Sequence, residues 1–255
     1  MDSPEETTGD IDVDTATVVT YAERPELDAL AWEVTNDAFP EYNNHGDTLT
    51  DYWPRLASER PDFQFCLIDR SGSILARCES LPIQWTGSLD DLPAGIDGAI
   101  VRGFENQDAN TLCAMVICVP RSLHGGSISP AALRAMRDLA TAHGFDNLLA
   151  PVRPSWKERY PLVPIEQYAT WRRSDGLLFD PWLRTHERLG ARVLRAEPKS
   201  LRITGAVAEW EERTRLAFPE SGSYWFPQGL STVSIDVAAD VGQYWEPNVW
   251  MLHET

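Results

Sequence analysis

A group of small residues between an apolar run and a helix-like segment could bind a phosphate. The apolar run is TLCAMVICV (residues 111–119), and the small residues are Gly125, Gly126, Ser127 and Ser129. The first backbone N–H groups of a helix have no partner inside the helix, and the helix dipole adds partial positive charge there. Small side chains allow a phosphate to come close to such N–H groups. By themselves these residues suit an ordinary turn and helix cap at least as well, so both interpretations stay open.

The neighbouring segments are expected to place this loop at the end of a sheet strand. The continuous apolar run is typical of a strand that is covered on both faces. Ser129 suits the N-cap and Pro130 the first position of a following helix, and Gly144 suits the position after its end. A second strand-like run, FDNLLAPV (residues 145–152), comes next. Together these patterns predict a parallel strand–helix–strand unit.

The rest of the chain alternates between strand-like and helix-like patterns. The clearest antiparallel hairpin lies in residues 63–85, around a turn at 70–73. The order of elements predicts an α/β sheet with hairpins, at least one parallel crossover and helices on both faces. The other expected elements are a strand in 15–22, a helix in 25–39, a loop and helix in 40–60, short strand content in 99–104, a helix in 180–190, and a further strand or hairpin in 191–205.

Composition and charge argue against several classes of function. The chain has 255 residues, 43% of them hydrophobic, which is enough for one large domain with a sizeable core. A formal net charge of −17 repels nucleic acids and anionic membrane surfaces. The sequence contains no run of 18 apolar residues that would predict a membrane-spanning helix. We therefore expect neither a nucleic acid nor a membrane as a partner.

The N-terminus and the cysteines are typical of a cytoplasmic protein. Residues 1–16 are acidic and polar and lack the basic and apolar segments of a signal peptide, so they are predicted to form a disordered leader. Cys66, Cys78, Cys113 and Cys118 lie in apolar runs without CxxC spacing. This pattern favours buried free thiols in a reducing compartment over disulfides. Neither the cysteines nor the scattered histidines have the spacing of a metal site.

The loop and a second motif resemble the GCN5-related N-acetyltransferase (GNAT) superfamily. In that family the acetyl-CoA loop follows the fourth strand and reads Gln/Arg-x-x-Gly-x-Gly/Ala, and the corresponding residues here are HGGSIS (124–129). The family's last helix often ends in a Tyr-Glu-Lys-Leu-Gly-Phe-like motif, and HERLGA (186–191) occupies that place. Both motifs depart from the pattern, since His replaces Gln/Arg in one and Tyr in the other. The resemblance covers Val18 to about Thr204 and implies a mixed, mostly antiparallel sheet flanked by helices, with acetyl-CoA or another acyl-CoA as co-substrate.

This resemblance also assigns roles to individual residues. His186 stands in the place of the family's acid, which protonates the departing CoA thiolate. It shares a helix face with Trp182 and Leu189, so a packed histidine is the alternative interpretation. Glu105, and alternatively Glu79, stand where family members carry a base, although a surface charge explains each equally. The implied acyl-CoA-binding residues are Ile117 and Val119 for pantetheine, and His124, Gly125, Gly126, Ser127, Ile128 and Ser129 for the pyrophosphate.

Two polar groups could serve the acceptor. Asn43, Asn44 and His45 lie where the family's segment between its first two helices lines the acceptor site, although a capped loop explains them as well. An insertion at 153–179 is longer than the family's usual link and carries both aromatic and basic residues. Its basic residues could clamp an anionic acceptor or the CoA phosphates, or could offset nearby acids; they include Arg153, Lys157 and Arg159.

The second half of the chain resembles a bacterial GNAT-like subgroup with an aromatic-rich C-terminal extension. The resemblance rests on VRPSWKERYPLVPIEQYATWRRSDG, AFPESGSYWFP and YWEPNVWM. It implies no substrate. Residues 205–255 are expected to pack as an extension on the acyl-CoA-binding domain, which spans 17–204. The aromatic residues would form either an added layer of core or a lid or acceptor pocket.

The expected function is that of a CoA-dependent acyltransferase. Direct attack by a small-molecule acceptor, expected to be an amine, would pass through a tetrahedral intermediate, and holding both substrates in line would supply much of the rate. A non-catalytic acyl-CoA-binding or scaffold protein on the same fold is the alternative, which the departures in both motifs favour. Decarboxylation of a CoA ester is a third interpretation without a supporting residue. Whether the chain forms a homodimer stays open.

Overall fold

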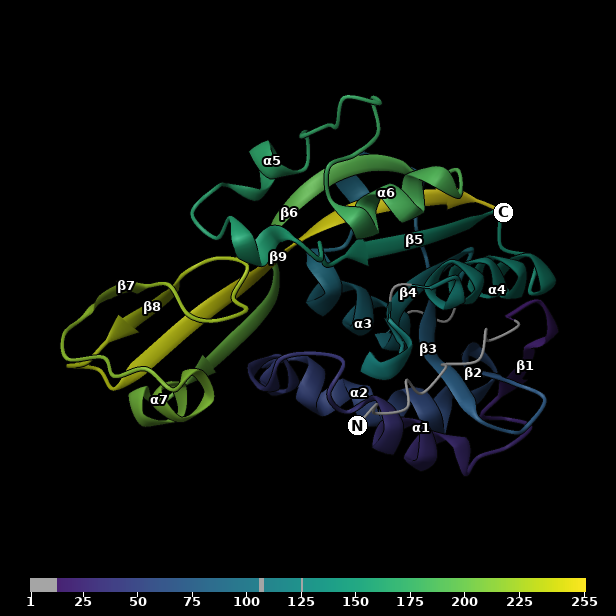
Figure 1. Ribbon diagram of the computed structural model, residues 1–255, viewed down its shortest axis with the longest axis horizontal. Helices are drawn as coiled ribbons and strands as arrows, with labels where there is room; N and C mark the ends of the chain where they lie inside the picture. Colours follow the sequence, from purple (N-terminus) through teal and green to yellow (C-terminus); the bar gives the residue numbers. More distant parts are fainter. Residues whose placement is uncertain (1–12, 106–107, 125) are drawn as a thin grey trace, which may run out of the picture.

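The computed structural model describes residues 13–105, 108–124 and 126–255, and one twisted sheet lies at its centre (Figure 1). The strand order is β1-β2-β3-β4-β5-β9-β8-β7, and β6 pairs with β9 off this path. Among these strands every pairing is antiparallel except that of β4 with β5. The predicted α/β sheet with hairpins and a parallel crossover is confirmed. The strands are β1 (Thr17–Thr20), β2 (Gln64–Ile68), β3 (Ile74–Ile83), β4 (Thr111–Cys118), β5 (Asn147–Val152), β6 (Arg192–Gly205), β7 (Gly222–Tyr224), β8 (Val233–Asp236) and β9 (Val241–Glu254).

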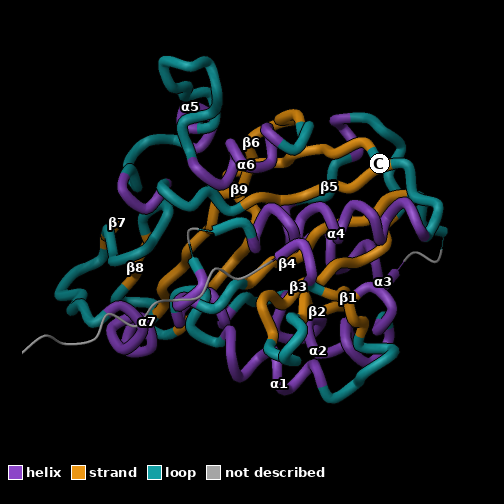
Figure 2. Tube along the Cα trace, turned by 45° about the vertical axis from the view of Figure 1, so that its right-hand side comes forward, coloured by secondary structure: helices purple, strands orange, loops and turns teal. Residues whose placement is uncertain are grey.

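Helices cover both faces of the sheet (Figure 2). On one face Met136 of α4 packs in a buried cluster with Leu112 of β4. On the other face Leu56 of α2 and Ile100 of α3 pack in a second cluster with Met115. None of the described helices is long and apolar enough to span a membrane. The helices are α1 (Leu27–Thr35), α2 (Leu49–Glu59), α3 (Gly95–Glu105), α4 (Ile128–Ala142), α5 (Ile165–Tyr168), α6 (Pro181–Arg188) and α7 (Val207–Thr214).

Strands β4 and β5 pair only near their beginnings and then separate. The paired residues are Leu112 with Leu148 and Cys113 with Leu149. The register between β3 and β4 shifts next to this point, and the shift leaves Met115 without a partner on β3. Such a bulge bends a strand and redirects its side chains. The two strand ends that follow therefore diverge and leave space between them.

The C-terminal residues belong to the sheet itself, which corrects the predicted extension at 205–255. Strand β9 pairs with β5 along one edge and with β6 along the other. Trp250 and Met251 on β9 are fully buried. An unpaired edge of β5 would expose a row of backbone groups, and β9 satisfies them. The predicted boundary after Thr204 also falls inside β6, which continues to Gly205 as one strand rather than a hairpin.

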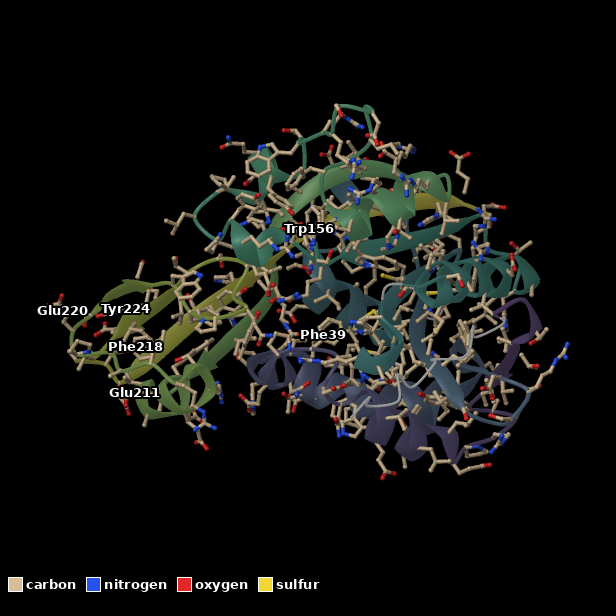
Figure 3. The ribbon with its side chains drawn as sticks, viewed as in Figure 1. Phe39, Trp156, Glu211, Phe218, Glu220 and Tyr224 are labelled. Atoms are coloured by element: carbon tan, nitrogen blue, oxygen red, sulfur yellow. The ribbon has the colours of Figure 1, made fainter. Side chains whose placement is uncertain are left out.

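Beyond β5, the outer halves of β6 and β9 form an arm with β7, β8 and α7, on the left in Figure 1. Its core gathers around Trp210, Phe226 and Tyr244. Figure 3 shows Phe218 and Tyr224 together on this arm, and their ring centroids lie 4.9 Å apart. The aromatic residues of this arm thus build a small core of their own.

The insertion at 153–179 packs over the sheet. Tyr160 and Trp171 meet edge to face with ring centroids 5.0 Å apart, and Tyr168 lies 5.1 Å from Trp171. The same cluster includes Val249 of β9. These aromatic side chains form an added layer of core, the first of the two predicted alternatives.

Three local expectations differ from the structure. Residues 99–104, predicted to have strand content, lie in helix α3, because Ala99, Ile100 and Gly103 recur at helical spacing on its buried side. Helix α4 begins at Ile128 with Ser127 at the N-cap, two residues before the predicted cap.

The last residues of the predicted leader at 1–16 are folded where the structure describes them. Residues 13–15 form a turn of 3-10 helix, and Val13 and Ala16 pack against the core that α4 covers. Residues 1–12 lie outside the described part of the chain. The apolar side chains of Val13 and Ala16 explain why this end of the segment joins the core.

Candidate active site

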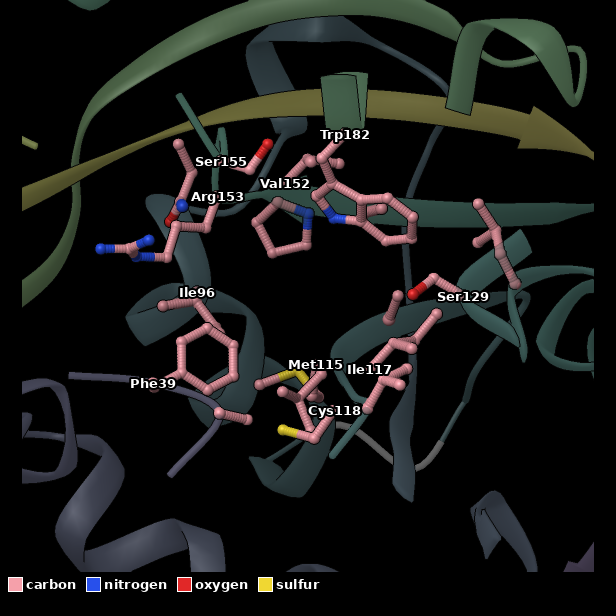
Figure 4. A pocket seen from close by; sticks show the side chains of 18 of the residues that line it. Phe39, Ile96, Met115, Ile117, Cys118, Ser129, Val152, Arg153, Ser155 and Trp182 are labelled. Carbon is pink, nitrogen blue, oxygen red and sulfur yellow. The ribbon is translucent and has the colours of Figure 1, made fainter. Parts of the chain in front are cut away.

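A cavity of about 820 Å³ lies where β4 and β5 separate (Figure 4). Met115 and Ile117 of β4 and Val152 of β5 contribute apolar walls, and Trp182 of α6 covers one side. The segment between α1 and α2 closes the opposite side with Phe39. A cavity of this size with mostly apolar walls and a few polar groups is typical of a small-molecule site.

The predicted phosphate-binding loop lies at this cavity. The Nε2 atom of His124 lies 2.8 Å from the carbonyl oxygen of Val119, which ties the loop to the strand before it. Gly125 lies outside the described residues. Ser127 is exposed, whereas the side chain of Ile128 is buried in the core, so only its backbone is available to a ligand. Of the predicted acyl-CoA-binding residues, those that line the cavity are Ile117, Val119, His124, Gly126 and Ser129.

The start of α4 is open to a ligand. The side chain of Ser127, at the N-cap, accepts no hydrogen bond from the first turn. A Cβ atom added at Gly126 would meet nothing within 4 Å. The N–H groups of this turn are therefore free of a side-chain cap, and an anion could approach them from the space beside Gly126.

His186 lines the cavity from α6, but its charge differs from that of the predicted acid. The residue is 2% exposed, and its Nδ1 lies 2.9 Å from Nε2 of His253 on β9. Burial, and then the nearby His253, lower the pKa of His186 well below its usual value. The structure thus argues against a resting imidazolium that donates a proton, because the ring is neutral near pH 7.

His253, the neighbour of His186, is also uncharged near pH 7. Burial, and then Arg137, lower the pKa of His253 to about 4. With both rings neutral, one of the two facing nitrogens donates and the other accepts. The remaining nitrogen of His186, Nε2, is buried and has no hydrogen-bond partner among the described residues. His186 therefore has one ring nitrogen left for a ligand.

The structure does not bring Glu105 to this site. Glu105 is exposed at the end of α3 and is not among the described residues that line the cavity. Glu79, the alternative base, is 3% exposed on β3 and lines a smaller neighbouring chamber. Asn43 and Asn44 line the main cavity, whereas His45 pairs with a glutamate at the surface.

A buried ion pair closes one end of the cavity, and the sequence interpretation missed its acidic half. The Nε atom of Arg153 lies 3.0 Å from Oε1 of Glu246, and Asn43 donates to the same oxygen at 2.8 Å. The hydroxyl groups of Tyr42 and Tyr244 lie 3.0 and 3.3 Å from Oε2. The carboxylate of Glu246 thus accepts four hydrogen bonds. It is therefore suited to hold the cavity wall in place rather than to accept a proton. A lone acidic residue inside YWEPNVWM was the sequence signal for this site.

The other two basic residues of the predicted clamp do not line the cavity. Lys157 is 1% exposed and donates from Nζ to the carbonyl oxygens of Tyr160 and Leu230. The guanidinium of Arg159 lies 4.5 Å from the ring centre of Trp156. Of the three, only Arg153 reaches the site, and it offsets a nearby acid.

The four cysteines are buried free thiols, as predicted. Cys118 lines the cavity, and Nη2 of Arg77 lies 3.5 Å from its sulfur. Burial raises the pKa of Cys118, and it raises those of Cys66 and Cys113 to about 12. These groups are therefore thiols near pH 7 and are poor nucleophiles. Among the described residues, no three His, Cys, Asp or Glu side chains gather as metal ligands.

Comparison with known proteins identifies the fold. No family model matches the chain. The chain is 28% identical over 270 residues to the arginine N-acetyltransferase avaD of Aspergillus versicolor, and the alignment covers 92% of each protein. The loading GNATL domain of CurA from Lyngbya majuscula superposes with a TM-score of 0.61 at 14% identity, over 94% of this chain and 97% of that one. The GNAT-like decarboxylase GphF, solved with isobutyryl-CoA, gives a TM-score of 0.60 at 16% identity, over 93% and 98%.

Proposed function

We propose that this chain, which has the GNAT fold, is a CoA-dependent acyltransferase that moves an acetyl or acyl group to the amine of a small molecule. The observation that carries the proposal is the cavity between the separated ends of β4 and β5, with the uncapped start of α4 beside it. The similarity to an arginine N-acetyltransferase along 92% of the chain supports an amine as the acceptor. Arginine is accordingly the first acceptor to test.

The acyl-CoA would bind along β4 and at the start of α4. Ile117 and Val119 contact the pantetheine, and the N–H groups between Gly126 and Ser129 hold the pyrophosphate. GphF, which has the same fold, was solved with isobutyryl-CoA, which supports an acyl-CoA as the co-substrate. The thioester then lies in the apolar part of the cavity, where water is excluded and the two substrates are held in line.

His186 would move the proton in this reaction. Its neutral ring accepts a proton from the amine nitrogen as that nitrogen bonds to the thioester carbon. Cleavage of the carbon–sulfur bond then releases a thiolate, which takes the same proton from His186. An acceptor that enters as the uncharged amine gives the amide and the free thiol of CoA without net release of a proton. His253 acts as a positioning residue that holds the ring.

The test measures binding and thiol release separately. Acetyl-CoA with L-arginine and a panel of primary amines should release free thiol in step with acetylated amine, as followed by a thiol reagent and mass spectrometry. Tight acetyl-CoA binding without thiol release for any amine would overturn the acyltransferase assignment and leave the non-catalytic alternative and the decarboxylation considered below.

Gly126→Leu should weaken acetyl-CoA binding at least about ten-fold, or about 1.4 kcal/mol, because the new side chain enters open space beside the loop without disturbing the fold. Gly222→Leu, at an exposed position on β7, is the matched control and should bind acetyl-CoA as the wild type does. Calorimetric titration measures both dissociation constants. An unchanged affinity in Gly126→Leu means that the pyrophosphate binds elsewhere.

Decarboxylation of a CoA ester is a second candidate function, favoured by the TM-score of 0.60 to the decarboxylase GphF. Such a reaction needs no amine. Incubation with malonyl-CoA alone separates the two functions, since a decarboxylase releases carbon dioxide and leaves the thioester intact. Acyl transfer instead depends on the amine and produces free thiol.

The proposal also includes a cytoplasmic location. Four buried free thiols suit a reducing compartment, because disulfides form and persist mainly in oxidising ones. Fractionation of the source cells with an antibody against the chain tests the location, and recovery in a secreted fraction contradicts it.

A further inference from the structure

A second, smaller chamber of about 280 Å³ adjoins the main cavity. The two share Trp32, Trp53 and Arg77 in their walls. The small chamber also contains Asp28 of α1 and Glu79 of β3. Arg77 therefore borders both spaces.

Two buried polar side chains in this chamber have unmet hydrogen bonds. Arg77 and Glu79 are alternate residues of β3, they are 5% and 3% exposed, and the nearest atoms of their pair lie 3.9 Å apart. Nε of Arg77 and Oε2 of Glu79 have no hydrogen-bond partner among the described residues. Buried polar groups in folded proteins are nearly always paired, and one without a partner lowers the stability of the fold. A ligand that supplies partners to both atoms would offset this loss of stability.

The charge and the aromatic walls of the chamber favour a cation. Asp28 and Glu79 are acidic, and Arg77 is the basic residue among the described residues that line it. The indole ring of Trp32 is 45% exposed and already has the guanidinium of Arg77 at 4.7 Å from its centre. Faces of indole rings attract guanidinium and ammonium groups. Burial raises the pKa of Glu79, and a cation beside Oε2 would stabilise the ionised carboxylate.

We infer that this chamber binds the cationic end group of the acceptor, a guanidinium or alkylammonium, while the amine to be acylated lies in the main cavity. The inference rests on the proposed function. The cationic group donates to Oε2 of Glu79 and lies against Trp32. Nε of Arg77 donates to an oxygen of the same acceptor, such as a carboxylate. The substrate class is therefore amines that carry a second, cationic group.

Calorimetric titration of the full chain without acyl-CoA tests this assignment. The probes are L-arginine and L-citrulline, whose uncharged urea group has nearly the shape of the guanidinium. L-Arginine should bind at least about ten-fold more tightly than L-citrulline, since only a cation meets the carboxylate and the indole face. Glu79→Gln should remove this preference. Glu33→Gln, at an exposed position of α1 outside both chambers, should keep it.

A second variant covers the case in which Glu79→Gln does not fold. Trp32 is half exposed, so Trp32→Leu should leave the fold intact and weaken L-arginine binding several-fold. Equal binding of L-arginine and L-citrulline to the wild type overturns the inference. So does an unchanged L-arginine affinity in Trp32→Leu or in folded Glu79→Gln.

The outcome for the chamber is distinct from that for the proposed function. Acyl transfer to amines together with no preference for the guanidinium overturns the chamber assignment alone. Selective L-arginine binding that depends on Glu79, with no thiol release from acetyl-CoA, overturns the proposed function alone.

Discussion

Burial decides the chemistry of single residues in this cavity. His186 and Cys118 both line it, and both would be candidate reactive groups if they had their ordinary pKa values. Removal from water disfavours the charged form of each, so the imidazole stays unprotonated and the thiol stays protonated. At neutral pH the imidazole of His186 is therefore unprotonated, and Cys118 is a thiol and a poor nucleophile. Burial thus has opposite effects on the protonation of two residues that line the same cavity.

Replacing His253 with glutamine should flatten the dependence of stability on pH. The folded protein lowers the pKa of His253 from 6.5 to about 4, so the unfolded chain binds more protons between these values. Stability from the neutral ring is complete above the unfolded pKa and is lost as the pH falls toward the folded one. Urea unfolding at about pH 7.5 and about pH 5 should show the wild type losing about 2 kcal/mol more than His253→Gln.

His143→Gln, the same substitution at an exposed position, is the control for this comparison. If His253→Gln and the wild type lose the same free energy of unfolding, the ring of His253 titrates normally and the neutral pair with His186 is wrong.

Among the elements, β9 joins the two parts of the fold. Strand β9 pairs with β5 beside the cavity. It also pairs with β6, and this pairing continues into the arm. Glu246, on the same strand, accepts hydrogen bonds from Tyr42, Asn43 and Arg153, which come from two other segments of the wall. The strand therefore carries both core packing and one end of the site.

Trp250→Ala should destabilise the protein by about 3–5 kcal/mol. The indole of Trp250 is fully buried in the cluster with Leu149 and Met115, so its removal leaves a large hole in the core. Trp225→Ala makes the same change at a position that is 50% exposed and should cost less than about 0.5 kcal/mol. Chemical unfolding followed by circular dichroism measures both. Similar values for the two variants would contradict the central position of β9.

For the whole molecule, the net charge of −17 works in two directions. It opposes compaction, because like charges repel across the surface. It also attracts cationic solutes, which fits an acceptor with a positive end group. The proposed co-substrate, an acyl-CoA, is anionic, so under this proposal local donors such as the N–H groups at the start of α4 have to hold it against the net charge.

Sodium chloride between about 0.05 M and about 0.5 M should raise the Tm by a few degrees, since salt screens the repulsion between exposed carboxylates. Differential scanning calorimetry at constant pH measures the change. Sucrose at the same osmolality is the control for effects that do not depend on charge. A Tm that falls with salt would indicate that attractive surface ion pairs outweigh the net repulsion.

Much of the fold could be predicted from the sequence because it depends on local patterns. The apolar run at 111–119, the helix after it and the strand at 145–152 follow from hydrophobic spacing and helix-end residues within a few turns of chain. The same patterns led to the loop at 124–129, which the structure places at the cavity as far as its residues are described. They also predicted that the four cysteines are buried thiols.

The tertiary structure alone decided the state and the partners of the site residues. His186 meets His253 across 67 positions of the chain, and Arg153 meets Glu246 across 93. Local spacing contains no information about such pairs, and burial, which sets the pKa values, is complete only when distant segments close over a side chain. For this reason the sequence could indicate a loop for an acyl-CoA. Only the folded chain showed that His186 is neutral, that Glu105 lies away from the cavity, and that a second chamber adjoins it.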